Sequence, residues 1–276
     1  MSDVLIDRRE NGVALITLNR PESLNAMGGQ LMPLLGQYLQ ECADDRKVRV
    51  VVVTGAGRAF CAGGDVKGMA AGRQVTGERA DNGEMSPGRL LWQSIETLRA
   101  SQRATSYMLH TMPKPTIAMV NGHAVGAGLS LALACDIRIA SENAKLGTIF
   151  RNVGFSGDFG GSYFLTKICG IAKARELYFG GEILDAQAAL TVGLVNRVVA
   201  HDRLEEETMA FAANLAAGPA LAYARMKENL NRAETSDLLT LLDQEAVNMQ
   251  LSGLTQDHRE AAQAFVEKRQ PQFKGL

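Results

Sequence analysis

The sequence lacks the features that mark several classes of protein. Its 29 basic residues nearly balance 30 acidic ones, so the net charge is −1 and no positive field favours DNA or RNA. No uninterrupted apolar run approaches the roughly 20 residues that a membrane-spanning helix needs. The first residues show neither the apolar segment of a signal peptide nor an Arg/Ser-rich presequence. We therefore expect neither a nucleic-acid partner nor a membrane partner.

Cysteine is scarce, and its positions show no metal-ligand spacing. Cys42, Cys61, Cys135 and Cys169 are scattered along 276 residues, which indicates reduced thiols rather than a disulfide framework. We expect no metal site and a cytoplasmic location. The hydrophobic content of 46% and the charged content of 21% are typical of a globular protein with a sizeable core.

The most informative stretch spans residues 115–136. The apolar run 116–120 predicts a buried strand, and the apolar run 129–134 predicts a buried helix. Gly126, Ala127 and Gly128 lie between them. A strand, a turn of small residues and a helix N-terminus direct free N–H groups to one place. The stretch predicts either a site for an oxygen anion or a turn whose small residues serve packing alone.

A second stretch repeats this design. Residues 48–54 predict a strand, and the small residues of 61–64 follow it. Two such turns could each aim one N–H group at a single carbonyl oxygen. A backbone oxyanion hole of this kind stabilises an enolate or a tetrahedral intermediate.

These two stretches, AFCAGGDVK and VNGHAVGAGLSLALACDIRIA, resemble the paired signatures of the crotonase (enoyl-CoA hydratase/isomerase) superfamily. Three further segments match in the same order: LNRPESLNAM, GGEILDAQAALTVGLVNRVV and AFVEKRQPQF. Because five ordered matches extend over nearly the whole chain, the protein is identified as a member of this superfamily.

The predicted elements favour an α/β fold. Residues 4–18 predict two strands, and residues 23–44 predict a helix. The resemblance implies a crotonase-type spiral of ββα units over residues 1–200. It also implies a helical C-terminal trimerisation region over 201–276, and hence a homotrimer or a hexamer built as a dimer of trimers.

The resemblance implies that Gly64 and Ala127 supply the oxyanion N–H groups. Hydratases of the family typically carry two glutamates, and this chain has Ser130 and Phe150 at those positions. Paired carboxylates activate water and deliver a proton, which serine and phenylalanine do poorly. An ordinary hydratase is therefore not expected.

Asp158 is the one carboxylate in a third glycine-rich turn, over residues 153–161. It could be a helix N-cap, although Gly160 and Gly161 stand between it and the predicted helix. Ring-opened and ring-epoxide acyl-CoA isomerases and 4-chlorobenzoyl-CoA dehalogenases of the family place a carboxylate there. The dehalogenases also need a histidine, where this chain has Arg103. We interpret Asp158 as the acid/base, with a pKa raised by burial beside neighbouring phenylalanines, Phe155 and Phe159.

The resemblance also implies a coenzyme A site, with coenzyme A as part of the substrate and no separate cofactor. The matching positions lie in the early segment, around the first small-residue turn and near the C-terminus, where a neighbouring subunit would contribute. They are Ser23, Leu24, Ala26, Ala62, Asp65, Val66, Lys67, Phe265 and Lys268.

Three functions remain open. The first is an isomerase that shifts a double bond in an enoyl-CoA through a thioester enolate, with Asp158 as acid/base. The second is a hydratase, or another crotonase reaction, with an atypical acid/base set. The third is a non-catalytic acyl-CoA-binding protein. Trp92 is predicted to lie in the core, and residues 69–86 are predicted to be a loop over the pocket.

Overall fold

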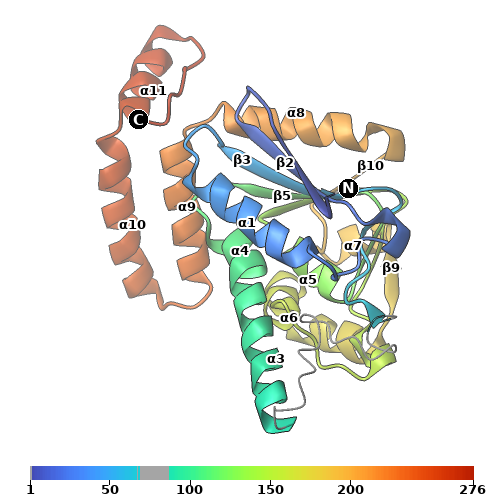
Figure 1. The fold of residues 1–276 in the computed structure, drawn as a ribbon. Helices are drawn as coiled ribbons and strands as arrows, with labels where there is room; N and C mark the ends of the chain where they lie inside the picture. Colours follow the sequence, from blue (N-terminus) through green and yellow to red (C-terminus); the bar gives the residue numbers. More distant parts are fainter. Residues whose placement is uncertain (1, 67, 69–86) are drawn as a thin grey trace.

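The computed structural model describes residues 2–66, 68 and 87–276 and shows two β-sheets flanked by helices (Figure 1). Within these ranges, a six-stranded sheet has the order β1-β2-β3-β5-β7-β10 and a four-stranded sheet has the order β4-β6-β8-β9. The strands of the larger sheet are Val4–Arg8 (β1), Val13–Leu18 (β2), Val50–Gly55 (β3), Thr116–Val120 (β5), Ile137–Ser141 (β7) and Arg197–Val199 (β10). Those of the smaller sheet are Ala59–Cys61 (β4), His123–Val125 (β6), Lys145–Gly147 (β8) and Ile183–Asp185 (β9).

From β3 to β8, consecutive strands alternate between the two sheets. Strands β5 and β6 lead into α5 (Ala127–Leu133), and strands β7 and β8 lead toward α6 (Gly161–Gly180). Neighbouring strands pair in parallel except at β1–β2 and β8–β9. This succession confirms the α/β spiral of ββα units that was expected.

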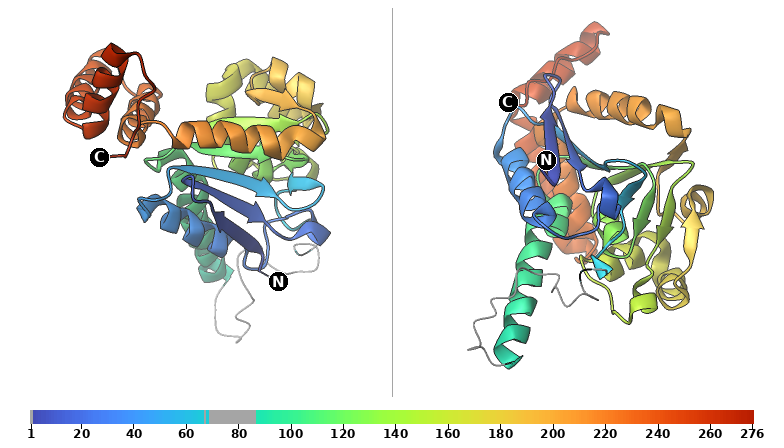
Figure 2. Two further views of the ribbon diagram at one scale, coloured as in Figure 1. Left: turned by 90° about the horizontal axis from the view of Figure 1, so that it is seen from above. Right: turned by 45° about the vertical axis from the view of Figure 1, so that its right-hand side comes forward.

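Strand β3 is buried on both faces, as its unbroken valine run predicts. Val50 and Val52 join a core beneath α8 (Leu204–Ala216), which crosses one face of the sheet (Figure 2). Val51 and Val53 join the larger core on the other face. The strand alternation therefore divides one apolar run between two cores.

Helix α1 spans Leu31–Asp44, so the prediction that it begins at residue 23 is wrong. A short 3-10 turn, Pro21–Ser23, is followed by Leu24 and Asn25 in the left-handed conformation. The buried Asn25 side chain donates to the Ala59 and Ala56 carbonyls at 2.8 Å and 3.0 Å. These contacts hold the segment beside β4 and outside helix α1.

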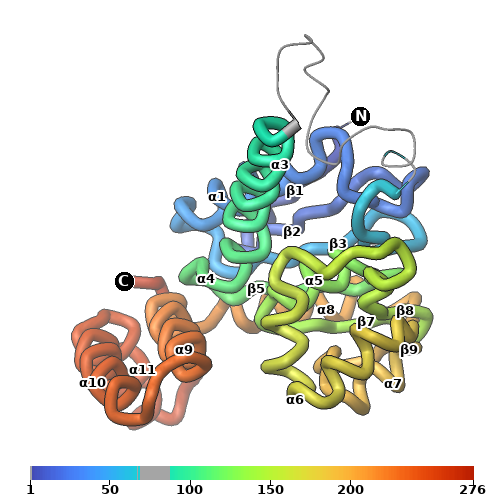
Figure 3. Tube along the Cα trace, turned by 90° about the horizontal axis from the view of Figure 1, so that it is seen from below, coloured from blue at the N-terminus to red at the C-terminus, as the bar shows by residue number. Residues whose placement is uncertain are grey.

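Helix α3 (Pro87–Gln102), a π-helical turn at residues 103–107 and α4 (Met108–Thr111) form one rod that projects from the body (Figures 1 and 3). The prediction that Trp92 lies in the core is wrong, because Trp92 is 59% exposed on this rod. Arg99 lies over its ring at 5.6 Å. A predicted loop at residues 69–86 lies outside the described residues.

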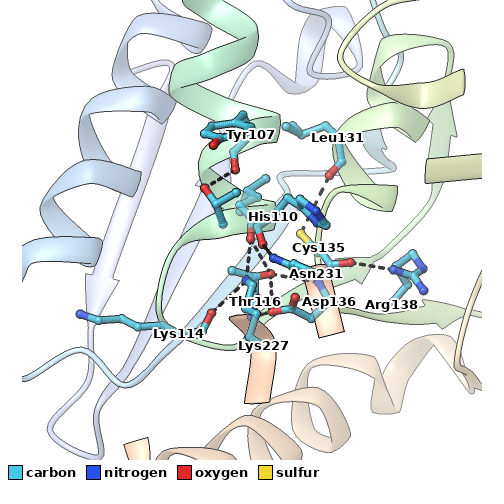
Figure 4. Close-up of polar contacts among 12 residues, drawn as sticks. Tyr107, His110, Lys114, Thr116, Leu131, Cys135, Asp136, Arg138, Lys227 and Asn231 are labelled. Carbon is cyan, nitrogen blue, oxygen red and sulfur yellow. Dashed lines mark hydrogen bonds and ion pairs between the residues drawn. The ribbon is translucent and has the colours of Figure 1, made fainter. Parts of the chain in front are cut away.

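The C-terminal helices α9 (Ala220–Ala233), α10 (Leu238–Gly253) and α11 (Gln256–Glu267) lie together beside the sheets (Figures 1 and 3). Lys227 of α9 reaches the core and donates to the carbonyls of Leu109 and Lys114 at 2.8 Å and 3.1 Å (Figure 4). A division at residue 200 stays a prediction, since α8 packs on the sheet whereas α9–α11 lie beyond it.

The remaining elements are short. They are helix α7 (Ala186–Thr191) and 3-10 turns at Phe150–Val153 and His201–Arg203. In the part of the chain that the structure describes, every helix is too short or too polar to cross a membrane.

Candidate active site

A cavity of about 1080 Å³ lies where the rod that begins with α3 meets the two small-residue turns. Its walls come from α1, α3, the turn after β4, the start of α5 and the loop at 149–159. Gly64, Ala127 and Asp158 all line it. Three residues that come from separate predicted turns therefore share one space.

The first turn is held against the early segment of the chain. The Met27 amide donates to the Gly63 carbonyl at 2.7 Å, and Met27 forms a parallel bridge with Gly64. In such a bridge the flanking residues 63 and 65 face the partner strand, so the Gly64 amide points to the opposite side. Gly64 itself lines the cavity.

The second turn presents the N-terminus of α5. Gly126 has a φ of 55°, and its own amide donates to the Gly147 carbonyl at 2.9 Å. Ala127 is the first residue of the helix, where amides have no partner within the helix. The amide of Ala127 therefore belongs to the set that a helix N-terminus offers to an anion.

The two turns touch at Gly63. This residue has a φ of 85°, and a Cβ atom there would lie 2.8 Å from the Val125 carbonyl oxygen and 3.3 Å from the Ala127 nitrogen. Only glycine permits this approach, which places the turns that carry Gly64 and Ala127 side by side. Their joint action on one oxygen stays a prediction.

Asp158 lies in the loop before α6, and one of its carboxylate oxygens, Oδ1, is buried. No atom of the described residues hydrogen-bonds Oδ1, and burial raises the pKa of Asp158 to about 6. The N-cap of α6 is Gly160, with no side-chain capping bond, so Asp158 does not cap the helix. A carboxyl group with this pKa suits proton transfer near neutral pH.

Two phenylalanines near Asp158 have different environments. Phe159 is buried, with 4% exposed, whereas Phe155 is 55% exposed. Burial raises the pKa of Asp158 as expected, and the share of each ring in that burial stays a prediction. Both still line the cavity.

The two positions that hold glutamate in hydratases of the family are occupied here by a serine and a phenylalanine. Ser130 is 1% exposed, and its Oγ donates to the Gly126 carbonyl at 3.4 Å. Phe150 lines the cavity and stacks on Tyr178 at a centroid distance of 5.9 Å. Neither side chain exchanges protons near neutral pH.

The predicted coenzyme A contacts divide into three groups. Ala62 and Val66 line the cavity beside the first turn. Ser23, Leu24 and Ala26 belong to the neighbouring segment, where the Ala62 amide donates to the Leu24 carbonyl at 3.0 Å.

The remaining predicted contacts lie elsewhere. The Asp65 carboxylate accepts a hydrogen bond of 2.9 Å from the Gly68 amide. Phe265 is 85% exposed on α11 and Lys268 ends that helix, in the lobe beside the sheets. Lys67 lies outside the described residues. All of these coenzyme A roles stay predictions.

Residues that sequence reasoning missed include Asn25, Gln102 and Tyr178. Asn25 fixes the segment beside the first turn. Asparagine tolerates the left-handed backbone that Asn25 adopts, so its place in the run NRPESLNAM was a possible signal. Gln102 and Tyr178 lie within helices α3 and α6, and no local motif marked them.

The comparisons with known proteins agree with this geometry. A family model described as enoyl-CoA hydratase/isomerase matches residues 8–276. The structure of an enoyl-CoA hydratase from Bacillus anthracis has a TM-score of 0.86 and 32% sequence identity, covering 100% of both chains. The chain therefore belongs to the enoyl-CoA hydratase/isomerase, or crotonase, family.

Two relatives from Escherichia coli strain K12 show the range within this family. The chain is 36% identical to 1,2-epoxyphenylacetyl-CoA isomerase over 277 residues, covering 100% of both chains. It is 33% identical to 2,3-dehydroadipyl-CoA hydratase over 275 residues, again covering 100% of both. Similar overall likeness to an isomerase and a hydratase means that residues of the site must distinguish the reactions.

Proposed function

We propose that the protein shifts a carbon–carbon double bond of an enoyl-CoA between the α,β and β,γ positions. The observation that carries this proposal is the presence of Asp158, with a pKa raised to about 6, on the wall shared by the two small-residue turns. Ser130 and Phe150 occupy the positions of the hydratase glutamates, which favours a reaction that needs one carboxylate.

The proposed mechanism uses one base on one face of the substrate. The Asp158 carboxylate removes a proton from the α or γ carbon and returns it to the other. Between these steps the thioester oxygen carries the enolate charge. The N–H groups of Gly64 and Ala127 would hold that oxygen, each contributing about 2.7–4 kcal/mol in the transition state.

The loop around Asp158 supports the role of a base. Because its buried Oδ1 has no hydrogen-bond partner among the described residues, the carboxylate is not stabilised by a donor that would lower its basicity. Desolvation thus makes the ionised form a stronger base toward a carbon acid. The water-excluding Phe150 and Phe159 rings beside the cavity act in the same direction.

The test is to compare Asp158→Asn with Ser130→Ala on panels of trans-2- and trans-3-enoyl-CoA, with hydration and double-bond shift followed separately. Asp158→Asn keeps the size of the side chain but removes the base, so we expect a loss of about 10²–10⁴-fold in the isomerisation rate. CoA affinity should hardly change, and Ser130→Ala should cost far less. Full activity in Asp158→Asn, or equal losses in both variants, would contradict the proposal.

A hydratase with an atypical acid/base set is the second candidate, favoured by the hydratase among the relatives. Ring-epoxide isomerisation is a third reaction to include, since a relative carries that name. The same panel, extended with a ring-epoxide acyl-CoA, separates them by product. Binding of acyl-CoA without turnover of any member would instead support the non-catalytic alternative.

We also propose that the chain assembles as a homotrimer or a dimer of trimers, in the cytoplasm. The lobe of α9–α11 exposes many large apolar side chains that a second copy would cover. They include Leu230, Leu238, Leu239, Met249, Leu254, Phe265 and Val266. A stable monomer in light scattering at micromolar concentration would contradict this assembly.

A further inference from the structure

Gln102 and Phe159 join two distant parts of the chain at the candidate active site. The Phe159 amide donates to the Gln102 Oε1 atom at 2.8 Å, although the two residues are 57 apart in the sequence. Gln102 is the last residue of α3, and Phe159 directly follows Asp158. The bond therefore holds the peptide group that links Asp158 to its neighbour.

The backbone at this place is strained. Phe159 has a φ of 50°, a left-handed conformation that a bulky side chain rarely adopts. Gly157 and Gly160 on either side also have positive φ, at 101° and 78°. A strained residue persists only where its surroundings hold it, and such residues cluster at functional sites.

Gln102 is surrounded by close packing and hydrogen bonds. The π-helical turn at residues 103–107 begins immediately after it, and π turns of this kind are frequent at functional sites. Ala104 of this turn packs so closely on α1 that a Cβ on Gly36 would lie 3.0 Å from its Cβ. The Ser106 Oγ donates to the Gln102 carbonyl at 3.2 Å. Both the backbone and the side chain of Gln102 are thus held.

We propose that Gln102 is a positioning residue that fixes Asp158 for proton transfer by holding the Phe159 amide. This inference rests on the proposed function of Asp158. A neutral amide suits the task because its oxygen accepts the hydrogen bond without a negative charge beside the Asp158 carboxylate. A glutamate would hold the loop equally well but would raise the pKa of Asp158 further.

Two variants separate the hydrogen bond from the charge. Gln102→Met keeps the length of the side chain and removes the acceptor. Gln102→Glu keeps the acceptor and adds the charge. Gln93→Met, on an exposed face of the same helix, is the matched control.

We expect Gln102→Met to lower kcat about 10- to 100-fold with little change in KM, because small misplacements of a reacting group are costly. Its Phe159 amide should exchange with solvent faster than in the wild type. Gln102→Glu should keep slow exchange and recover most of the rate at high pH, with the pH midpoint of kcat above that of the wild type. Gln93→Met should match the wild type in each measurement.

Hydrogen exchange at Phe159 does not depend on which reaction the protein performs. If Gln102→Met keeps the wild-type kcat while Asp158→Asn is inactive, the positioning role is overturned and the proposed function still stands. Full activity in Asp158→Asn would overturn the proposed function and the positioning role with it. An unchanged pH midpoint in Gln102→Glu, or equal loss of rate in both Gln102 variants, would also overturn the positioning role.

Discussion

The Lys227 Nζ atom of α9 lies 2.8 Å from the Oδ2 atom of Asp136, the residue before β7 (Figure 4). The same Asp136 oxygen accepts hydrogen bonds from the Thr116 amide and hydroxyl at 2.7 Å and 2.9 Å. The Lys227 side chain is 9% exposed, and its other donors reach backbone carbonyls. The ion pair therefore attaches the C-terminal lobe to the central sheet.

Lys227→Met should lower the free energy of unfolding by about 3–5 kcal/mol, because it leaves Asp136 charged without its partner inside the protein. Equilibrium denaturation measures the loss. Lys173→Met, at an exposed ion pair with Glu176, is the control and should leave the midpoint nearly unchanged. Equal midpoints for Lys227→Met and the wild type would show that the pair does not hold the lobe.

Gly63→Ala should lower kcat for isomerisation about 10²–10³-fold, the usual cost of losing one oxyanion donor. The added Cβ would meet the Val125 carbonyl oxygen at 2.8 Å, so the turn that carries the Gly64 amide must shift. Gly193→Ala is the matched control, because its φ of 82° is similar and its nearest neighbour would be 3.8 Å away. If both variants lose the same activity, backbone strain alone explains the loss and the oxyanion assignment fails.

The rate of isomerisation should depend on pH through Asp158. Only the ionised carboxylate accepts a proton, so kcat/KM should rise with pH about a midpoint near 6, where burial sets the pKa. Initial rates between pH 4.5 and pH 8 would show this. A midpoint close to 4, the ordinary value for aspartate of about 3.9, would mean that the carboxylate is solvated during the reaction.

Asp158→Asn should be more stable than the wild type at pH 7. The folded-state pKa of Asp158 is about 6, above the value of about 3.9 expected when unfolded. The folded protein thus binds more protons in this window, and wild-type stability falls as pH rises from about 4 to 6. Thermal unfolding at pH 4 and pH 7 tests this, since the advantage of the variant should shrink at the lower pH. A variant less stable than the wild type at pH 7 would contradict the burial of an unpartnered charge.

Local signals in the sequence determined the class of fold and much of the site. Three features each indicate the backbone conformation at their own position. They are the valine run of β3, the glycine turn before α5 and the glycines around Asp158. Strand periodicity and glycine placement are short-range properties, so they can be read without the rest of the chain. The departures at Ser130 and Phe150 were also visible directly, once the family pattern was known.

Only the tertiary structure decided how these pieces meet. Gln102 holds Phe159 from 57 residues away, and Asn25 keeps residues 24–27 out of helix α1 through contacts with β4. Trp92 is exposed because α3 projects from the body, which its helical period cannot show. Burial, and with it the raised pKa of Asp158, depends on neighbours brought together from several elements. Such long-range contacts produce no periodic pattern in the sequence, because they join residues that are far apart along the chain.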